Sequence, residues 1–281
     1  NIEVQEEVQA NQNMPIYAIC DEFNANDGFA EFDLLSQDTL VLDGQDPADY
    51  NVSYYLTQNE ADLALDELDD IYENITNPQI IYVRVDDITI TNSICWATTE
   101  ITLRVDLLPI FDLDDDYLLC LNTNGTEVVD FPILYTELSN ADYTFEWSLN
   151  GSVLPAETTS SLMPSVGGTY SVLVVNNITG CENTDTAIVN ESSPPTITAA
   201  VVSNVFATNH IVDVTAVGLG VYEYSLGNGS WQNSNVFENV SLGIHTVTVR
   251  DINGCGIATT SVLVIDYPLF FTPNGDGYHD T

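Results

Sequence analysis

Gly168-Thr-Tyr-Ser-Val-Leu-Val-Val-Asn176, which runs on into Gly180-Cys181, decides the fold that we expect for this chain. Large apolar side chains alternate here with small or polar ones, which is the period of a strand that buries one face of a sheet. Gly243-Ile-His-Thr-Val-Thr-Val-Arg-Asp251 repeats the pattern and runs on into Gly254-Cys255. The two stretches indicate an internal repeat of domain size.

Similar segments, rich in Val, Ile, Thr and Tyr, lie between Gly, Asn, Asp and Pro turns along the chain. This spacing predicts an all-β chain of tandem β-sandwiches. We expect a linker or the continuation of an upstream region at 1–13, sandwiches at 14–108, 109–193 and 194–267, and the start of a further domain at 268–281. The expected strands are Phe29–Leu35, Asn51–Thr57, Gln79–Val85, Thr99–Leu107, Tyr143–Leu149, Gly168–Asn176, Tyr222–Leu226 and Gly243–Asp251.

One short helix is predicted inside the first sandwich. Thr57 and Glu60 fit a capping box, in which each side chain bonds the backbone of the other residue. Apolar residues follow at helical spacing, namely Ala61, Ala64, Leu65, Leu68 and Ile71. We therefore expect the helix to continue through these positions.

The charge balance is strongly acidic, with 43 Asp and Glu residues against three arginines and no lysine. Such a field repels nucleic acid and anionic lipid, so neither is an expected partner. The hydrophobic fraction of 44% is that of a folded protein, and no apolar run is long enough to span a membrane. The start, Asn1–Glu7, has neither the basic nor the apolar region of a signal peptide.

Motifs for catalysis are missing from the sequence. It contains no Gly-x-Ser-x-Gly elbow, no phosphate loop and no His-Glu-x-x-His, and its three histidines are isolated from zinc-ligand spacings. In a chain this acidic, paired carboxylates carry little information about hydrolytic chemistry. We expect that the chain is not an enzyme.

Calcium is the one expected cofactor, at two candidate sites. Asp112, Asp114, Asp115 and Asp116 cluster between the first two expected sandwiches, where a hard cation could take several carboxylate oxygens; the alternative is a solvated acidic linker. The second candidate is the loop at the end of the chain. Its spacing resembles part of a calcium loop with Gly277 near its turn, and its donors are Thr272, Asn274, Asp276, the Tyr278 carbonyl and Asp280.

Five cysteines leave the disulfide pairing open. We expect Cys20 to pair with Cys95 and Cys120 with Cys181, so that each bridge closes one sandwich. Cys255 is then left over, either as a buried thiol or as one whose partner lies elsewhere. Two such bridges indicate an oxidising compartment.

The final stretch resembles the opening of the gliding-motility-associated C-terminal domain, the type B sorting signal of the Bacteroidetes type IX secretion system. The matching residues are Phe270, Phe271, Thr272, Pro273, Asn274, Gly275, Asp276 and Gly277, followed by Tyr278, His279 and Asp280. His279 stands where the family more often has Asn, and the rest of the sorting domain is missing. The resemblance implies recognition by the type IX translocon and by outer-membrane components that receive type B signals, with attachment to the cell surface or release.

The repeats themselves resemble the Ig-like and PKD-like modules of large Bacteroidetes surface adhesins. This resemblance implies a stalk or adhesion region that meets surface glycans or other cells. The alternative is that the modules are spacers, or glycan-binding modules, of a secreted carbohydrate-active enzyme. Glycan binding would be favoured if Tyr54, Tyr55, Trp96 and Trp231 are exposed; if they are buried, they only form part of the core. Thr39 and Thr186 stand in Asp-Thr-apolar triplets that look like Bacteroidetes O-glycosylation acceptors.

Overall fold

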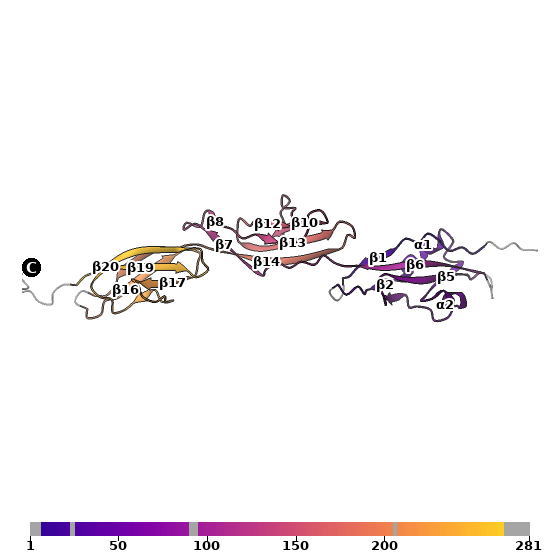
Figure 1. Ribbon diagram of the computed structural model, residues 1–281, viewed down its shortest axis with the longest axis horizontal. Helices are drawn as coiled ribbons and strands as arrows, with labels where there is room; N and C mark the ends of the chain where they lie inside the picture. The colour runs from indigo at the N-terminus through magenta and orange to yellow at the C-terminus, as the bar shows by residue number, and fades with distance from the viewer. Residues whose placement is uncertain (1–6, 23–25, 90–94, 205–206, 267–281) are drawn as a thin grey trace, which may run out of the picture. The chain divides into compact units, whose positions relative to one another are not determined.

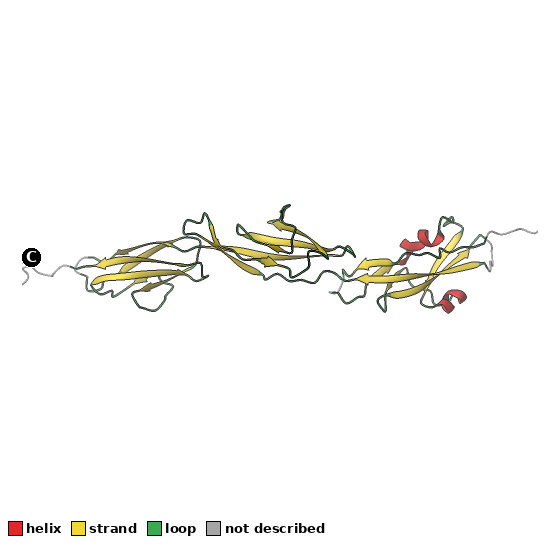
Figure 2. Ribbon diagram, turned by 45° about the horizontal axis from the view of Figure 1, so that its top comes forward, coloured by secondary structure: helices red, strands yellow, loops and turns green. Residues whose placement is uncertain are grey.

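The computed structural model describes residues 7–22, 26–89, 95–204 and 207–266. It divides the chain into two compact units: unit 1 comprises residues 1–110, 142–144 and 174–183, and unit 2 comprises residues 111–141, 145–173 and 184–281. Strands form most of the regular structure, and the described helices lie in unit 1 (Figure 2). The expected sorting signal, Phe270–Gly277, lies outside the described residues, as do Asp280 and the rest of the terminal loop.

The main sheet of unit 1 has the strand order β1-β6-β5-β3, of which β1, β6 and β5 are labelled in Figure 1. The strands are β1 (Tyr17–Cys20), β3 (Tyr50–Tyr55), β5 (Gln79–Asp87) and β6 (Trp96–Asp106). β1 pairs with β6 in parallel, whereas β5 pairs with β6 and with β3 in antiparallel fashion. Alternation decides which face is buried: Ile81, Val83 and Val85 of β5 are fully buried, and Ile80 points outward.

A second layer covers this sheet. It contains the antiparallel pair β2 (Glu31–Asp33) and β4 (Ile71–Glu73), the 3-10 helix η1 (Leu34–Gln37) and the helix α1 (Asp38–Leu42). Phe32, Leu34 and Val41 of this layer join the buried face of the sheet in one core. Unit 1 is therefore built around a sandwich, which we call the first sandwich.

The predicted helix is confirmed, but it is shorter than its apolar spacing suggests. α2 spans Gln58–Leu63 and begins at the capping box of Thr57 and Glu60. It ends at Ala64, which adopts a left-handed conformation with φ 50°. The Arg84 guanidinium donates to the carbonyl oxygens of Ala61 and Asp62, each at 2.9 Å, so the last carbonyls have a partner without a further turn.

The expected strand Phe29–Leu35 is also shorter than predicted. β2 covers only Glu31–Asp33, after which the chain turns into η1. The Ser36 hydroxyl donates to the Asp33 carbonyl at 2.6 Å, and such a local bond competes with strand pairing. Neither η1 nor α1 was predicted.

A six-stranded sheet, in the order β11-β10-β13-β14-β7-β8, begins unit 2, with the pair β9 and β12 beside it. We call these strands the second sandwich; residues 142–144 and 174–183, which include the start of β10 and the turn between β13 and β14 with the adjoining strand ends, belong to unit 1. Trp147 and Phe145 of β10 are buried in its core, as the alternation predicts. The strands are β7 (Asp116–Leu121), β8 (Val128–Asp130), β9 (Leu134–Tyr135), β10 (Tyr143–Leu149), β11 (Ser152–Val153), β12 (Ser161–Leu162), β13 (Gly168–Asn176) and β14 (Glu182–Ser192).

Two three-stranded sheets, β15-β16-β18 and β17-β19-β20, complete unit 2 and form the third sandwich. Val212 and Val214 from one sheet meet Val247, Val249 and Val264 from the other in a buried core. None of the described helices of the chain is long and apolar enough to cross a membrane. The strands are β15 (Thr196–Val201), β16 (Val212–Val217), β17 (Tyr222–Leu226), β18 (Val236–Phe237), β19 (Gly243–Asp251) and β20 (Ile257–Val264).

Candidate functional site: two disulfides at strand ends

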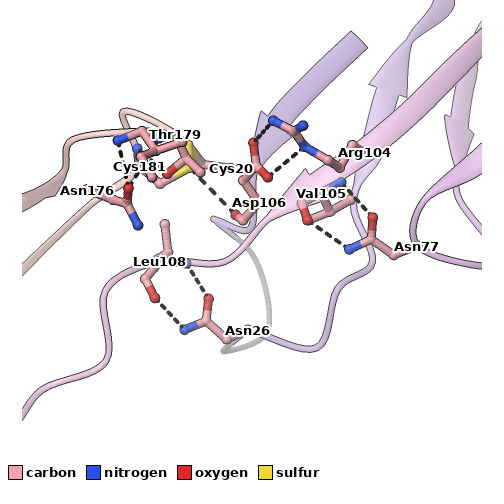
Figure 3. Close-up of a disulfide and its surroundings, with 11 residues drawn as sticks. Cys20, Asn26, Asn77, Arg104, Val105, Asp106, Leu108, Asn176, Thr179 and Cys181 are labelled. Carbon is pink, nitrogen blue, oxygen red and sulfur yellow. Dashed lines mark hydrogen bonds and ion pairs between the residues drawn. A yellow bond between two sulfur atoms is a disulfide. The ribbon is translucent and has the colours of Figure 1, made fainter. Parts of the chain in front are cut away.

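The first disulfide joins Cys20 to Cys181, both in unit 1, with a Cα–Cα distance of 5.5 Å (Figure 3). Cys20 is the last residue of β1 and stands opposite Asp106, the last residue of β6. Cys181 comes immediately before β14, in the turn that follows β13. The bond therefore fastens the end of a parallel strand pair to a hairpin.

A network of hydrogen bonds shapes the hairpin turn that carries Cys181. The Asn176 side-chain oxygen accepts from the backbone N–H groups of Ile178 and Thr179, at 2.9 and 3.2 Å. The Asn176 N–H donates to the Cys181 carbonyl at 2.9 Å and closes the turn. These bonds satisfy the backbone of the turn locally, so Cys181 is held in place by hydrogen bonds as well as by the disulfide.

Two asparagine side chains hold the chain that leaves β6, next to the disulfide (Figure 3). The Asn77 amide donates to the Val105 carbonyl at 2.8 Å and accepts from the Val105 N–H at 2.9 Å. Asn26 makes the same two bonds with Leu108, at 3.1 and 2.7 Å. Each amide thus makes the pair of backbone hydrogen bonds that a neighbouring strand would make. The chain around Asp106 is therefore held at Val105 before it and at Leu108 after it.

The second disulfide joins Cys120 to Cys255 within unit 2, with a Cα–Cα distance of 5.2 Å. Cys120 lies on β7, which pairs in parallel with β14, and stands opposite Ser192, the last residue of β14. Cys255 lies in the turn between β19 and β20. The construction repeats that of the first disulfide.

A buried carboxylate organises the turn that carries Cys255. Asp251 accepts hydrogen bonds from the Cys255 N–H at 3.0 Å, the Ser192 hydroxyl at 2.8 Å and the Val221 N–H at 3.2 Å. Three donors compensate the cost of burying this carboxylate. One of these donors, Ser192, is the last residue of β14 and stands opposite Cys120. The Asp251 carboxylate therefore connects the strand end beside Cys120 with the turn that carries Cys255.

The predicted pairing within each sandwich is wrong. Cys20 stands at one end of β6 and Cys95 precedes the other end, so an eleven-residue strand separates them. At about 3.3 Å per residue this is roughly 35 Å, far beyond the roughly 4.4–6.8 Å between the Cα atoms of a disulfide. The eleven residues of β14 separate Cys120 from Cys181 in the same way. Cys255, expected to be left over, is bonded, and Cys95 is in neither disulfide.

The acidic cluster predicted to bind calcium lies exposed before and at the start of β7. Burial raises the pKa of Tyr117, and the carboxylates of Asp114, Asp185 and Asp112 raise it further. Across the described ranges, no group of three or more His, Cys, Asp or Glu side chains is arranged to hold a metal ion. Calcium binding at Asp112 and Asp114–Asp116 stays a prediction, and the second candidate loop, with Asn274, Asp276 and Asp280, lies outside the described residues.

The four aromatic residues considered for glycan binding divide into two pairs. Tyr54 and Tyr55 are buried, and Tyr54 belongs to the core of unit 1. Trp96 and Trp231 are each 38% exposed, and an arginine guanidinium lies over each ring, Arg84 at 4.5 Å and Arg250 at 4.2 Å from the ring centre. The sequence does not predict these cation–π contacts, because the residues of each pair are distant in the chain. Arg84 and Trp96 come together through the pairing of β5 with β6, and Trp231 reaches Arg250 of β19 from a loop.

Of the remaining predicted positions, Thr39 on α1 and Thr186 on β14 are both exposed, and their glycosylation stays a prediction. His210, which looks isolated in the sequence, has two neighbours: Ser203 Oγ lies 3.4 Å from Nδ1 and Asp266 Oδ2 lies 3.6 Å from Nε2. The first distance is at the long end for a hydrogen bond and the second lies beyond that range. The carboxylate faces the opposite ring nitrogen from the serine. We assign no catalysis to this group.

Comparison with known proteins bears on the first sandwich and on the fold. Residues 16–109 match the model of the Flavobacterium inter-domain disulphide bond domain, a third of the chain that includes Cys20 and Cys95 and stops short of the terminal stretch. This match agrees with the Bacteroidetes Ig-like repeats that the sequence resembles. No curated protein matches the chain.

Solved structures with a similar fold are strings of immunoglobulin domains. Sidekick-1 immunoglobulin domains 1–4 are 12% identical, with 92% of this chain and 76% of that chain covered and a TM-score of 0.40. Extracellular domains 3–5 of Drosophila OTK are 10% identical, with 94% and 99% covered and a TM-score of 0.38. The four N-terminal Ig domains of Dscam1 isoform 6.9 are 11% identical, with 93% and 73% covered and a TM-score of 0.33. The fold assignment rests on the strand pairing and the sandwich cores described above: the chain is a tandem Ig-like all-β protein.

Proposed function

We propose that this chain is a load-bearing stalk or adhesion region of a secreted surface protein. The observation that supports this most is the repeated disulfide: in both cases a cysteine at the end of a parallel strand pair is bonded to the closing hairpin of the next sandwich in the sequence. A bond at this place limits how far consecutive modules can separate under tension.

The two bonds interleave along the chain, since Cys120 lies between Cys20 and Cys181. Once all sandwiches are unfolded, the shortest covalent path from residue 1 to residue 281 uses both disulfides: it crosses from Cys20 to Cys181, returns along the chain to Cys120 and crosses to Cys255. This path includes roughly 110 residues, or about 380 Å at full extension. With both disulfides reduced, the fully extended chain reaches about 1,000 Å.

Single-molecule stretching of the whole chain from its two ends tests this proposal. We expect a final extension of about 380 Å under oxidising conditions and about 1,000 Å after reduction. The Cys20→Ser variant should lengthen to an intermediate value, because the path through Cys120 and Cys255 then limits the extension. Equal extensions before and after reduction would contradict a load-bearing role for these bonds.

We further propose that the protein leaves the cell through the type IX secretion system and serves as a gliding or surface adhesin. The Phe270–Gly277 motif and its resemblance to type B signals support this route, and the disulfides fit an oxidising exterior. Its expected partners are the translocon, the outer-membrane components that receive type B signals, and glycans or other cells.

Removal of residues 270–281, followed by cell fractionation in a host with this secretion system, tests the route. The truncated chain should stay in the periplasm, whereas the complete chain should reach the surface or the medium. As a control, the Asp280→Asn variant keeps the Phe-Phe-Thr-Pro core of the motif and should still be exported. Normal export of the truncated chain would remove the assignment.

A second candidate function is glycan binding as a module of a carbohydrate-active enzyme. The exposure of Trp96 and Trp231 favours it, because an indole can stack on a sugar ring; the arginine over each indole occupies one face. Trp96→Ala and Trp231→Ala variants should then lose binding to immobilised polysaccharides.

The matched control is Phe131→Ala, which removes an exposed aromatic residue elsewhere. Trp147 is not a suitable control, because it is buried and its replacement would disrupt the core.

A further inference from the structure

The last hairpins of the three sandwiches close in the same way. In each, the N–H of the last residue of one strand donates to the carbonyl of the residue just before the next strand. The bonds are Asp87 to Cys95 at 3.5 Å, Asn176 to Cys181 at 2.9 Å and Asp251 to Gly256 at 2.9 Å. Cys95 and Cys181 therefore occupy the same position, and Cys255 precedes it by one residue.

The first two of these hairpins share a further bond. The Asp87 side chain accepts from the Thr89 N–H at 2.8 Å, and the Asn176 side chain accepts from the Ile178 N–H at 2.9 Å, two residues on in each case. Cys95 and Cys255 are also both half-buried. The three cysteines form one class, which we call hairpin cysteines.

The other two cysteines form a second class, which we call strand-end cysteines. The strand order β1-β6-β5-β3 of the first sandwich has the same connectivity as β7-β14-β13-β10 of the second. In both, the first strand pairs in parallel with the last. Cys20 and Cys120 stand opposite the last residues of these final strands.

Each disulfide joins one member of each class. Cys20 bonds to Cys181 and Cys120 to Cys255, so a strand-end cysteine always reaches the hairpin cysteine of the sandwich that follows it in the sequence. Two of the three hairpin cysteines are thus observed in a bond of the same kind. Cys95 is the third, and it is in neither of these disulfides.

We propose that Cys95 forms a disulfide with a strand-end cysteine of a further Ig-like sandwich that precedes the first one in the polypeptide. The inference rests on the proposed stalk function and identifies its partner. A second copy of this chain does not supply that partner, because both of its strand-end cysteines are already bonded to its own hairpins. Neither does the third sandwich, whose first strand, β15, contains no cysteine.

Formation of the bond is an oxidation. The Cys95 thiol and the partner thiol each give up one proton and one electron as the two sulfur atoms join, and the oxidant is a protein disulfide of an oxidising compartment, which is reduced to two thiols. The same chemistry makes the two disulfides already present, so no additional reagent is required.

The test is a disulfide map of the complete polypeptide from its natural source, collected with an alkylating agent that blocks thiols. Because the chain has so few arginines and no lysine, digestion at Asp and with chymotrypsin under non-reducing conditions is the appropriate method. We expect the Cys95 peptide to be bonded to a cysteine outside residues 1–281, at the end of the first strand of a sandwich. A Cys95→Ser variant of the same polypeptide should show one more alkylated cysteine than the unchanged protein, namely the released partner.

Three outcomes overturn the inference: alkylated Cys95, a Cys95–Cys95 bond between two copies, or a bond to a cysteine that is not at a strand end. The same map separates this inference from the proposed function. If Cys20–Cys181 and Cys120–Cys255 are found and Cys95 is alkylated, only the inference fails. If those two bonds are missing as well, the serial disulfides of the stalk fail with it.

Discussion

Arg84 shows how much one side chain can organise in a chain with three cations. Its guanidinium donates two hydrogen bonds to Asp86 at 2.7 Å, reaches the last carbonyls of α2 and lies over Trp96. The other two arginines are also paired, Arg104 with Asp106 and Arg250 with Glu223. All three cations are therefore used internally, and the remaining surface charge is negative.

Replacing Arg84 by alanine should lower the free energy of unfolding by about 2–4 kcal/mol, because it leaves two helix carbonyls and a half-buried carboxylate without their donor. Arg104→Ala is the matched control: its side chain is 40% exposed and its ion pair is screened by water, so we expect little change. Chemical denaturation of both variants provides the measurement. Equal losses would mean that Arg84 acts only as a surface ion pair.

Asp38 offers a pH-dependent prediction. Burial raises the pKa of its carboxyl, and the neighbouring carboxylates of Asp70 and Asp33 raise it further, while the hydrogen bond from Tyr54 at 2.7 Å lowers it. A raised pKa means that folding favours the protonated form, so this contribution to stability is complete below the unfolded pKa of 3.8 and is lost as the pH rises through the higher folded value.

The Asp38→Asn variant should therefore gain stability relative to the unchanged protein as the pH rises above about 4, with the difference levelling off once the folded carboxyl has ionised. Asp43→Asn, which removes the same charge from an exposed position, corrects for the general repulsion. Melting temperatures across the acidic range measure the difference. A gain that is the same for both variants at every pH would contradict the role of burial.

At the level of elements, the bounds of a short segment depend on the hydrogen bonds at its two ends and not on its apolar period. The Glu60 side chain accepts from the Thr57 N–H at 2.9 Å, and the Thr57 hydroxyl accepts from the Glu60 N–H at 3.2 Å. α2 has only six residues and one buried side chain, Ala61, so isolated helix propensity could not maintain it. The cap and Arg84 hold its two ends.

Thr57→Ala should cost about 1 kcal/mol, since one helix N–H group loses its acceptor. Thr57→Ser keeps the hydroxyl and should restore most of the stability. Hydrogen exchange of the α2 amides, measured beside global unfolding, shows whether the loss is local. If the serine variant is as weak as the alanine variant, the hydroxyl is not what holds the helix.

For the whole molecule, the balance lies between charge and covalent links. With a net charge of −40, the acidic side chains repel one another and favour an expanded chain. The two interleaved disulfides, with sequence separations of 161 and 135, limit the expansion of the unfolded chain. In the chain-entropy view each loop contributes about 5 kcal/mol by itself, and less when the other is present because the two overlap.

Calcium is the whole-molecule prediction that the acidic sequence supports. Calcium should raise the melting temperature and EDTA should lower it; at a hundredfold excess over Kd, one site contributes about 2.7 kcal/mol. Matched magnesium and sodium chloride solutions separate a specific site from screening of the surface charge. An Asp114→Asn, Asp115→Asn double variant should lose the specific part. No shift with calcium would exclude binding at both candidate sites.

The sequence by itself determined the strands whose period is strong. β10, β13, β17 and β19 have the bounds expected from alternation, and Trp147 is buried as predicted. It also determined the tandem β architecture and the start of α2, because alternation and capping act between residues close in the chain. The sequence did not predict where α2 ends or that η1 forms. Hydrogen bonds from the Arg84 guanidinium and from the Ser36 hydroxyl act at these two places.

Only the tertiary structure decided the disulfides. The order of the cysteines does not show which of them lie close together. Cys20 stands at the end of β6 and Cys95 just before its start; in the same way, Cys120 stands at the end of β14 and Cys181 just before its start. Pairing of β1 with β6, and of β7 with β14, sets this separation, and strand register is a long-range property. Bond formation depends on a few ångströms between Cα atoms, so the partners follow from the register and not from the order of cysteines along the chain.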